Sequence, residues 1–207
     1  MTPDALFWNR MARRYAGMKI PDEASYRHKL DRTGAYLTPE ARVFEFGCGT
    51  GTTALHHAPH VARIRGVDFA PEMIAIAQEK AAAQGATNAD FAVGTVEDEP
   101  GAGLWDMVMA HSVLHLVPDR DAAIAKAHAL LKPGGHFVSS TICLSDGLWF
   151  MRPVLPLMRL VRLAPARVAF FTADDLRAAI TQAGFELVED WRPSPRRALF
   201  LVARKPA

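Results

Sequence analysis

Residues 43–51 read Val43-Phe44-Glu45-Phe46-Gly47-Cys48-Gly49-Thr50-Gly51. An apolar run able to form a buried parallel strand carries one acid near its end and continues directly into three glycines, each two residues from the next. Glycine adopts backbone conformations that other residues avoid, and it lets a ligand approach the main chain closely. A strand that feeds such a turn, with a helix behind it, builds a nucleotide-sized pocket at the carboxyl end of a sheet.

Strand and helix patterns alternate on both sides of this turn. Strands are expected at 43–47, 64–69, 90–93, 105–110, 136–143, 186–191 and 198–204, and helices at 4–18, 26–37, 52–60, 72–84, 119–131 and 172–183. The alternation predicts an α/β three-layer sandwich with a seven-stranded, mostly parallel sheet. The last two strands are joined without a helix, which predicts an antiparallel last strand.

The length of 207 residues suits a single domain. Within it we expect four parts, which are a helical cap at 1–40, a ligand-binding core at 41–143, a substrate-side insertion at 144–171, and a C-terminal helix and hairpin at 172–207.

Composition narrows the class of protein. An apolar fraction of 50% predicts a folded chain, and a net charge of +2 is too small to indicate a nucleic-acid partner. The two cysteines give neither a disulfide framework nor zinc-type spacing, so no metal site is expected. The N-terminus does not resemble a signal peptide, and no apolar run approaches the roughly 18 residues of a membrane span. These features favour a cytoplasmic location.

The glycine spacing separates two nucleotide-binding motifs. A dinucleotide fingerprint that starts at Gly47 needs its third glycine at position 52, which is Thr52. The pattern Glu-x-Gly-x-Gly-x-Gly at 45–51 instead resembles motif I of the class I S-adenosylmethionine-dependent methyltransferases, which have a Rossmann-like fold. A plain strand–helix turn is the alternative interpretation.

Asp68 ends the second expected strand, about twenty residues past the glycines, where a carboxylate can bind ribose hydroxyls. The alternative is an ordinary acid that precedes a helix. Residues 66–73 are similar to the second motif of the same family. The similarity implies that Phe69 and Met73 flank the adenine.

Residues 94–98 occupy the place of a third motif, in which the family often has an aspartate that accepts from the adenine amino group. Here that position is Thr95, whose hydroxyl can accept the bond without a charge. Val96 could contribute backbone groups, and Glu97 matches the acid of the family pattern.

The fourth match runs from residue 104 to 115. The chain leaves the sheet at Ala110 and His111, over the expected position of the transferred methyl group. His111 and His115 are four residues apart and could share a helical face. One of them is a candidate general base, and the alternative is that both position or pack. The Asn/Asp-Pro-Pro-aromatic tetrapeptide of many base methyltransferases is absent.

The resemblance implies S-adenosylmethionine as cofactor. The main chain of Gly47, Cys48, Gly49 and Gly51 would hold its methionyl part, Glu45 its amino group, and Tyr15 its carboxylate. The expected reaction methylates a small, partly apolar molecule at O, N or C without a metal. The two cysteines do not resemble the thiol set of arsenite methyltransferases. Alternatives are a cofactor-binding module without turnover and an NAD-dependent enzyme.

Residues 148–171 are apolar and contain four arginines. The prolines at 153, 156 and 165 are expected to break this segment into short turns. It could form a lid over the acceptor, an interfacial patch in peripheral contact with a membrane, or a plain cover on the sheet. The sequence does not indicate an oligomeric state.

Overall fold

The protein is described by a computed structural model that covers residues 2–207. Seven strands form one sheet in the order β3-β2-β1-β4-β5-β7-β6. They are β1 Arg42–Phe46, β2 Arg63–Asp68, β3 Ala89–Val93, β4 Trp105–His111, β5 Leu131–Thr141, β6 Glu186–Trp191 and β7 Leu199–Arg204. The pairs among β1 to β5 are parallel, whereas β7 is antiparallel to both of its neighbours. The predicted fold class is confirmed.

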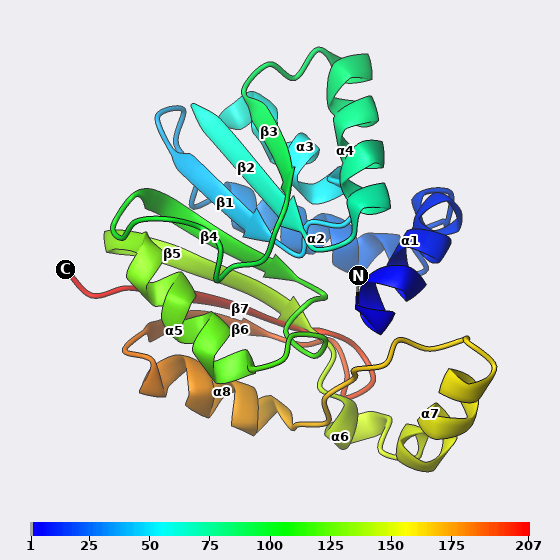
Figure 1. Ribbon diagram of the computed structural model, residues 1–207. Helices are drawn as coiled ribbons and strands as arrows, with labels where there is room; N and C mark the ends of the chain where they lie inside the picture. The colour runs from blue at the N-terminus through cyan, green and yellow to red at the C-terminus, as the bar shows by residue number, and fades with distance from the viewer. Residues whose placement is uncertain (1) are drawn as a thin grey trace.

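Helices cover both faces of the sheet (Figure 1). They are α1 Pro3–Ala16, α2 Glu23–Gly34, α3 Thr52–His57, α4 Pro71–Gln84, α5 Arg120–Leu130, α6 Leu144–Gly147, α7 Met151–Leu160 and α8 Ala173–Gln182, with a 3₁₀ turn at Ala58–His60. Helices α3 and α4 pack on one face, and α5 and α8 pack on the other. Helix α1 lies against α4, at the end of the sheet where the parallel strands finish.

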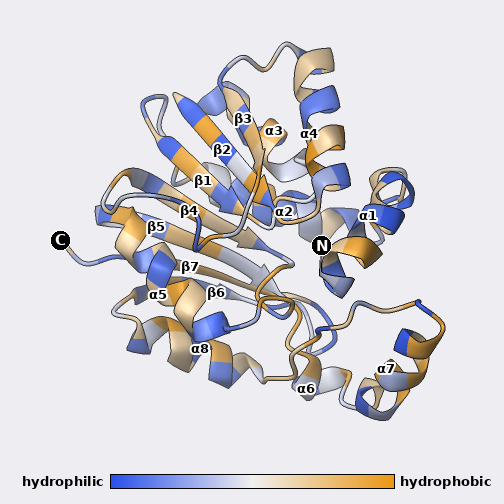
Figure 2. Ribbon diagram, in the orientation of Figure 1, coloured by the Kyte–Doolittle hydropathy of each residue, from blue (hydrophilic) through white to orange (hydrophobic). Residues whose placement is uncertain are grey.

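Alternating strand residues fill the two core layers. Val43 of β1 packs with Ile64 and Met107 on the α3–α4 face. The next residue, Phe44, packs with Val108 and other apolar residues on the α5–α8 face. This alternation is what a strand buried on both faces requires. Figure 2 shows the resulting apolar band along the central strands.

Two expected elements begin three or more residues earlier than predicted. Helix α2 starts at Glu23 rather than at 26, because the Asp22 side chain caps it by accepting a hydrogen bond from the Ser25 N–H (3.1 Å). Strand β5 begins at Leu131, and residues 132–135 are an irregularity inside it where the register with β4 shifts.

The expected break of residues 148–171 into short turns is wrong for α7, which is a ten-residue helix. Pro153 lies in its first turn, where an N–H has no intrahelical partner. Pro156 removes a single bond from the middle of the helix, and the buried side chain of Leu155 holds the helix to the body.

Candidate functional site

The glycine turn is built as the sequence predicts. Gly47, Gly49 and Gly51 all have positive φ values, of 62°, 53° and 71°. A Cβ on Gly47 would lie 2.3 Å from a methyl carbon of Val113, so a side chain does not fit there. The turn therefore needs glycine for its backbone conformation and, at Gly47, for its close packing.

Asp68 holds this turn in place from the end of β2. One carboxylate oxygen accepts from the Gly49 N–H (3.0 Å), and the other accepts from the Ala70 N–H (2.9 Å). Burial raises the pKa of Asp68, while the two backbone bonds oppose that shift. Each carboxylate oxygen keeps a further lone pair that can accept a bond from a ligand.

Glu45 is a buried acid with one unused oxygen. Its side chain is 2% exposed, and among the described residues no group donates to Oε2. The Ala54 N–H interacts with the carboxylate, but burial outweighs that bond and raises the pKa of Glu45 to about 8. A buried carboxyl with one unpartnered oxygen is costly, and a cationic ligand group would relieve that cost.

A cleft of about 490 Å³ opens beside these groups. Six of the predicted site residues line it, namely Tyr15, Glu45, Gly47, Cys48, Gly49 and His111. Tyr15 reaches it from α1, which places its ring 4.0 Å from the position that a Cβ of Gly49 would take. The cleft therefore joins the glycine turn to the end of β4.

The other predicted residues, Asp68 among them, do not line this cleft. Met73 and Val96 are buried in apolar clusters, and Ala110 is buried in β4. Phe69 is half-buried beside Asp68, and Glu97 is exposed. The remaining three are Gly51, which caps α3, Thr95 and His115.

Thr95 has a partner that the sequence reading missed. Its N–H and its hydroxyl both donate to Asp98 Oδ2, at 2.8 and 2.9 Å. The hydroxyl oxygen keeps its lone pairs, so it can still accept a bond.

His111 and His115 are not on a common helix, so that expectation is wrong. His111 is the last residue of β4, in register with Ser140 of β5. Ser112 then turns the chain with a φ of 56° and donates to the Ser140 carbonyl (2.7 Å). This bond keeps the segment in the sheet through His111 and places His115 in the following loop.

Both imidazoles are held neutral by burial. The pKa of His111 is lowered to about 3, first by burial and then by the charges of Lys29 and His57. Burial lowers the pKa of His115 to about 4. Within residues 2–207, His111 Nε2 and His115 Nδ1 have no hydrogen-bond partner.

Lys29 of α2 is a cleft residue that the sequence reading missed. Its Nζ donates to Ser140 Oγ at 3.0 Å, and burial lowers its pKa. Tyr26 lies one turn earlier and shares a 3.4 Å hydrogen bond with Thr53 of α3. Nothing in the sequence around Lys29 distinguishes it from a surface lysine, because only the packing of α2 over the sheet brings it to β5.

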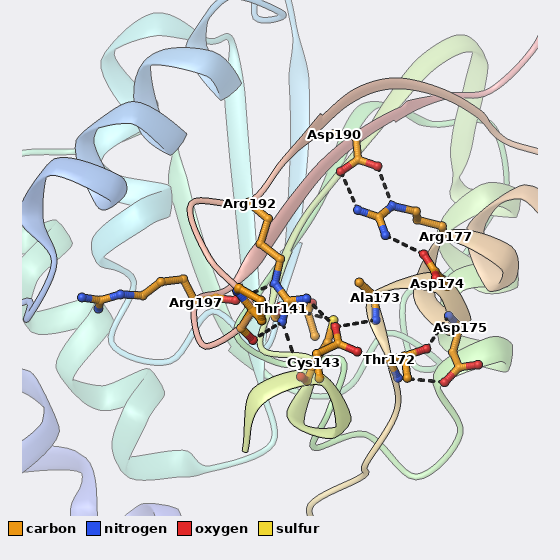
Figure 3. Close-up of polar contacts among 12 residues, drawn as sticks. Thr141, Cys143, Thr172, Ala173, Asp174, Asp175, Arg177, Asp190, Arg192 and Arg197 are labelled. Carbon is orange, nitrogen blue, oxygen red and sulfur yellow. Dashed lines mark hydrogen bonds and ion pairs between the residues drawn. The ribbon is translucent and has the colours of Figure 1, made fainter. Parts of the chain in front are cut away.

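The β6–β7 loop closes one side of the cleft through Trp191, Pro193, Arg196, Arg197 and Ala198. Figure 3 shows how Arg192 holds this loop. Its guanidinium donates to the Pro195 carbonyl (2.6 Å) and the Arg197 carbonyl (3.0 Å), and it pairs with Asp146 of α6. Arg197 in turn lies 3.4 Å from Asp22 at the start of α2. The loop is thus fixed to both sides of the cleft.

No group of three or more metal-ligating side chains occurs in the described part of the chain. Cys48 and Cys143 are both buried free thiols. Across residues 2–207 no helix is both long and apolar enough to cross a membrane.

Comparison with known proteins identifies the class. The methyltransferase domain family matches residues 11–190, so the chain belongs to that family. A ubiquinone biosynthesis O-methyltransferase from Xanthomonas axonopodis pv. citri is 31% identical over 194 residues, which cover 87% of this chain and 80% of that protein. An arsenite methyltransferase from Halobacterium salinarum is 29% identical over 84% of this chain, which spans about half (49%) of that relative.

Solved structures agree on the fold. The [4+2]-cyclase SpnF has a TM-score of 0.76 at 20% identity, with 92% of this chain and 84% of that chain covered. A chain from the complex of the Haloferax volcanii Trm112 activator with a methyltransferase has a TM-score of 0.75 at 18% identity, with 99% and 98% covered. The protein is an S-adenosylmethionine-dependent methyltransferase that acts on a small molecule.

Proposed function

We propose that this enzyme methylates a hydroxyl oxygen of a small, partly apolar acceptor that binds in the cleft beside His111. The observation that carries the proposal is the buried, unpartnered Nε2 of His111 at the end of β4, in the same cavity as the glycine turn. A neutral imidazole nitrogen accepts a hydrogen bond, and a hydroxyl donates one. That the Xanthomonas relative is named an O-methyltransferase supports this choice of atom.

The residues around the glycine turn suit S-adenosylmethionine. Glu45 would bind the methionyl ammonium through its unused oxygen, and Tyr15 would bind the carboxylate; that both residues line the cleft supports these roles. The free lone pairs of Asp68 are available to ribose hydroxyls. The proposed set also includes the residues predicted for the methionyl backbone and the adenine side, namely Gly47, Cys48, Gly49, Gly51, Phe69, Met73, Thr95, Val96, Glu97 and Ala110.

When bound, the cofactor supplies a methyl group on a sulfonium, which leaves as a neutral thioether. The acceptor hydroxyl loses one proton as its oxygen bonds to the methyl carbon and the sulfur–methyl bond breaks. His111 orients that hydroxyl by accepting its hydrogen bond. With a pKa of about 3, His111 does not hold a proton near neutral pH, so the proton of the hydroxyl goes to water. His115 lies outside the cleft wall, so its catalytic role stays a prediction.

Transfer of a radiolabelled methyl group tests the proposal. The purified enzyme is incubated with labelled S-adenosylmethionine and separate panels of phenols, alcohols, amines and carbon acids. We expect label on oxygen, and we expect His111→Gln to lower kcat by about 10²-fold while S-adenosylhomocysteine still binds. Label confined to amines or carbon would contradict the proposal. Tight cofactor binding without transfer to any panel would favour a binding module.

We also propose that α7 makes peripheral contact with an anionic membrane surface. Leu157 and Leu160 are 65% and 80% exposed, and Figure 2 shows the mixture of apolar and polar residues along this helix. Residues 147–173 contain four arginines and no acid, which suits anionic headgroups. No part of 144–171 lines the cleft in the described chain, which does not favour the lid.

Co-sedimentation with vesicles tests this contact. Binding to phosphatidylcholine–phosphatidylglycerol vesicles, weaker binding to pure phosphatidylcholine, and loss of binding in the Leu157→Gln, Leu160→Gln double variant are expected. Val93→Gln is the matched control, because Val93 is 56% exposed on the distant strand β3. Equal sedimentation of wild type and double variant would exclude α7 as the contact.

We propose a cytoplasmic location, which the two buried free thiols support. Fractionation of the source cells, followed by immunoblotting, tests it. Recovery of the protein outside the cytoplasmic and membrane fractions would contradict it.

A further inference from the structure

Lys29 carries a charge at the inner wall of the cleft without an acid to neutralise it. The described residues include no carboxylate within ion-pair distance of its Nζ, whose hydrogen bond goes to Ser140 Oγ at 3.0 Å. Asp22 is the nearby acid that acts on it electrostatically. That carboxylate is already engaged by Ser25, at 2.8 and 3.1 Å, and by Arg197 at 3.4 Å. Lys29 therefore has capacity left for an anionic ligand.

Ser140 and His111 complete the arrangement around Lys29. They are register partners at the ends of β5 and β4, and all three residues line the same cleft. With its proton on Nδ1, neutral His111 accepts from a ligand through its free Nε2, whereas an ammonium can only donate. A hydroxyl oxygen satisfies both residues. It donates a hydrogen bond to His111 while it is protonated, and it accepts from Lys29 once it carries a negative charge.

We propose that Lys29 binds the acceptor oxygen and holds it as an oxyanion, so that the natural acceptors are acidic hydroxyls of the phenol or enol type. This inference rests on the proposed O-methylation and deepens it. It gives each of two residues at this end of the cleft its own role. His111 orients the acceptor hydroxyl, and Lys29 sets the ionisation of that hydroxyl.

The acidity of the hydroxyl decides which acceptors benefit. A cation within about 4–6 Å lowers the pKa of an acid by about 1–3 units. A phenol such as the tyrosine side chain ionises near pH 10, so this shift raises its anionic fraction at pH 7 from about 0.1% to between about 1% and about 50%. An aliphatic alcohol is far less acidic and stays protonated after the same shift. The cleft therefore discriminates between hydroxyls by charge.

Other charged and titratable groups also face this point. Glu45 of β1 and Asp22 at the start of α2 are acids, and His57 of α3 is a buried imidazole whose pKa is lowered to about 4. Tyr15, Lys19 and Tyr26 also line the cleft, as do Arg196 and Arg197 of the β6–β7 loop. Glu45 lies on the glycine-turn side, where a bound cofactor ammonium would neutralise it.

A coloured phenol tests the proposal without any turnover. The visible absorbance of 4-nitrophenol reports whether the bound molecule is ionised, and S-adenosylhomocysteine keeps the methyl position empty. With the wild-type complex we expect the pKa of bound 4-nitrophenol to fall by about 1–3 units. Lys29→Met should remove this shift, and Lys29→Arg should retain part of it.

Arg27→Met is the matched control. Arg27 lies on the same helix, but its exposed side chain pairs with Glu23 at 2.8 Å, so the variant should leave the shift unchanged. Affinity for S-adenosylhomocysteine, measured by calorimetry, reports whether each variant is folded. No detectable 4-nitrophenol binding by the wild type, or an equal shift in Lys29→Met, overturns the inference.

The outcomes separate this inference from the proposed function. A shift that depends on Lys29, in an enzyme that methylates no hydroxyl, would support the oxyanion site and contradict O-methylation. Methylation of phenols together with an unshifted 4-nitrophenol would support O-methylation and overturn the role of Lys29. Equal methylation of phenols and aliphatic alcohols would also count against the role of Lys29.

Discussion

Glu45 makes cofactor affinity depend on pH, and the dependence can be calculated from its burial. In the unliganded protein the pKa of this carboxyl is about 8. A ligand ammonium needs the carboxylate form, so binding near neutral pH must release the proton. Affinity should then rise about tenfold per pH unit while the pH is below this pKa.

The expected size follows from the two titrations involved. Between about pH 6 and about pH 8, ionisation of Glu45 alone strengthens binding about 50-fold. The α-amino group of the ligand loses its proton near pH 8, so at that pH only half of the ligand carries the ammonium that binds. The increase in affinity is therefore about 25-fold, or about 2 kcal/mol.

Stability should respond in the opposite sense. The native state holds a proton on Glu45 that the unfolded state has released above its ordinary pKa of 4.5. The stability that this retained proton contributes is fully present below about pH 4.5. As the pH rises through about 8, the free energy of unfolding should fall by up to about 5 kcal/mol.

Calorimetry with S-adenosylhomocysteine in two buffers of different ionisation enthalpy measures the proton release directly. About one proton per ligand is expected near pH 6.5, and none in Glu45→Gln. Glu99→Gln is the control, because Glu99 is also buried but is bonded to Arg65 at 2.9 Å, away from the cleft. Equal proton release by wild type and Glu45→Gln would refute the reasoning.

Three further substitutions probe the glycine turn and the β6–β7 loop. Asp68→Asn should weaken S-adenosylhomocysteine binding by at least about 2 kcal/mol by calorimetry, since it removes charge-assisted bonds to the glycine turn, and unchanged affinity would remove Asp68 from the site. Gly47→Ala should lower the free energy of unfolding by about 1–3 kcal/mol in urea titration, because its Cβ would meet Val113; an unchanged midpoint would show that the turn relaxes. Arg192→Met should remove the ion-pair partner of Asp146 and raise the acceptor KM more than the cofactor Kd. Equal effects on the acceptor KM and the cofactor Kd would show that the β6–β7 loop does not act mainly on the acceptor.

The sequence predicted the glycine turn and the end of β2 well because their signals are local. The spacing of Gly47, Gly49 and Gly51 fixes a turn conformation within a few bonds, and Asp68 follows from the end of the next strand. The alternation of Val43 and Phe44 likewise predicts a strand buried on both faces. Such patterns need no knowledge of distant contacts.

The acceptor side could not be predicted in the same way. Lys29 reaches Ser140 across 111 positions of sequence, and only the packing of α2 over the sheet brings them together. The expected helical pair of histidines is wrong because pairing with β5 extends β4 through His111. The expected break at Pro156 is wrong because one lost backbone bond does not prevent a short, anchored helix.

The charges in the cleft explain why Lys29 should matter only over part of the pH range. Methyl transfer from a sulfonium to an oxyanion consumes both charges, so a cation beside the oxygen stabilises the reactant more than the transition state. Lys29 therefore gains rate only by increasing the oxyanion population, below the acceptor's own pKa. Above that pKa, Lys29→Met should turn over a phenol as fast as the wild type or faster. A variant that is slower by one constant factor at every pH would instead make Lys29 a positioning residue.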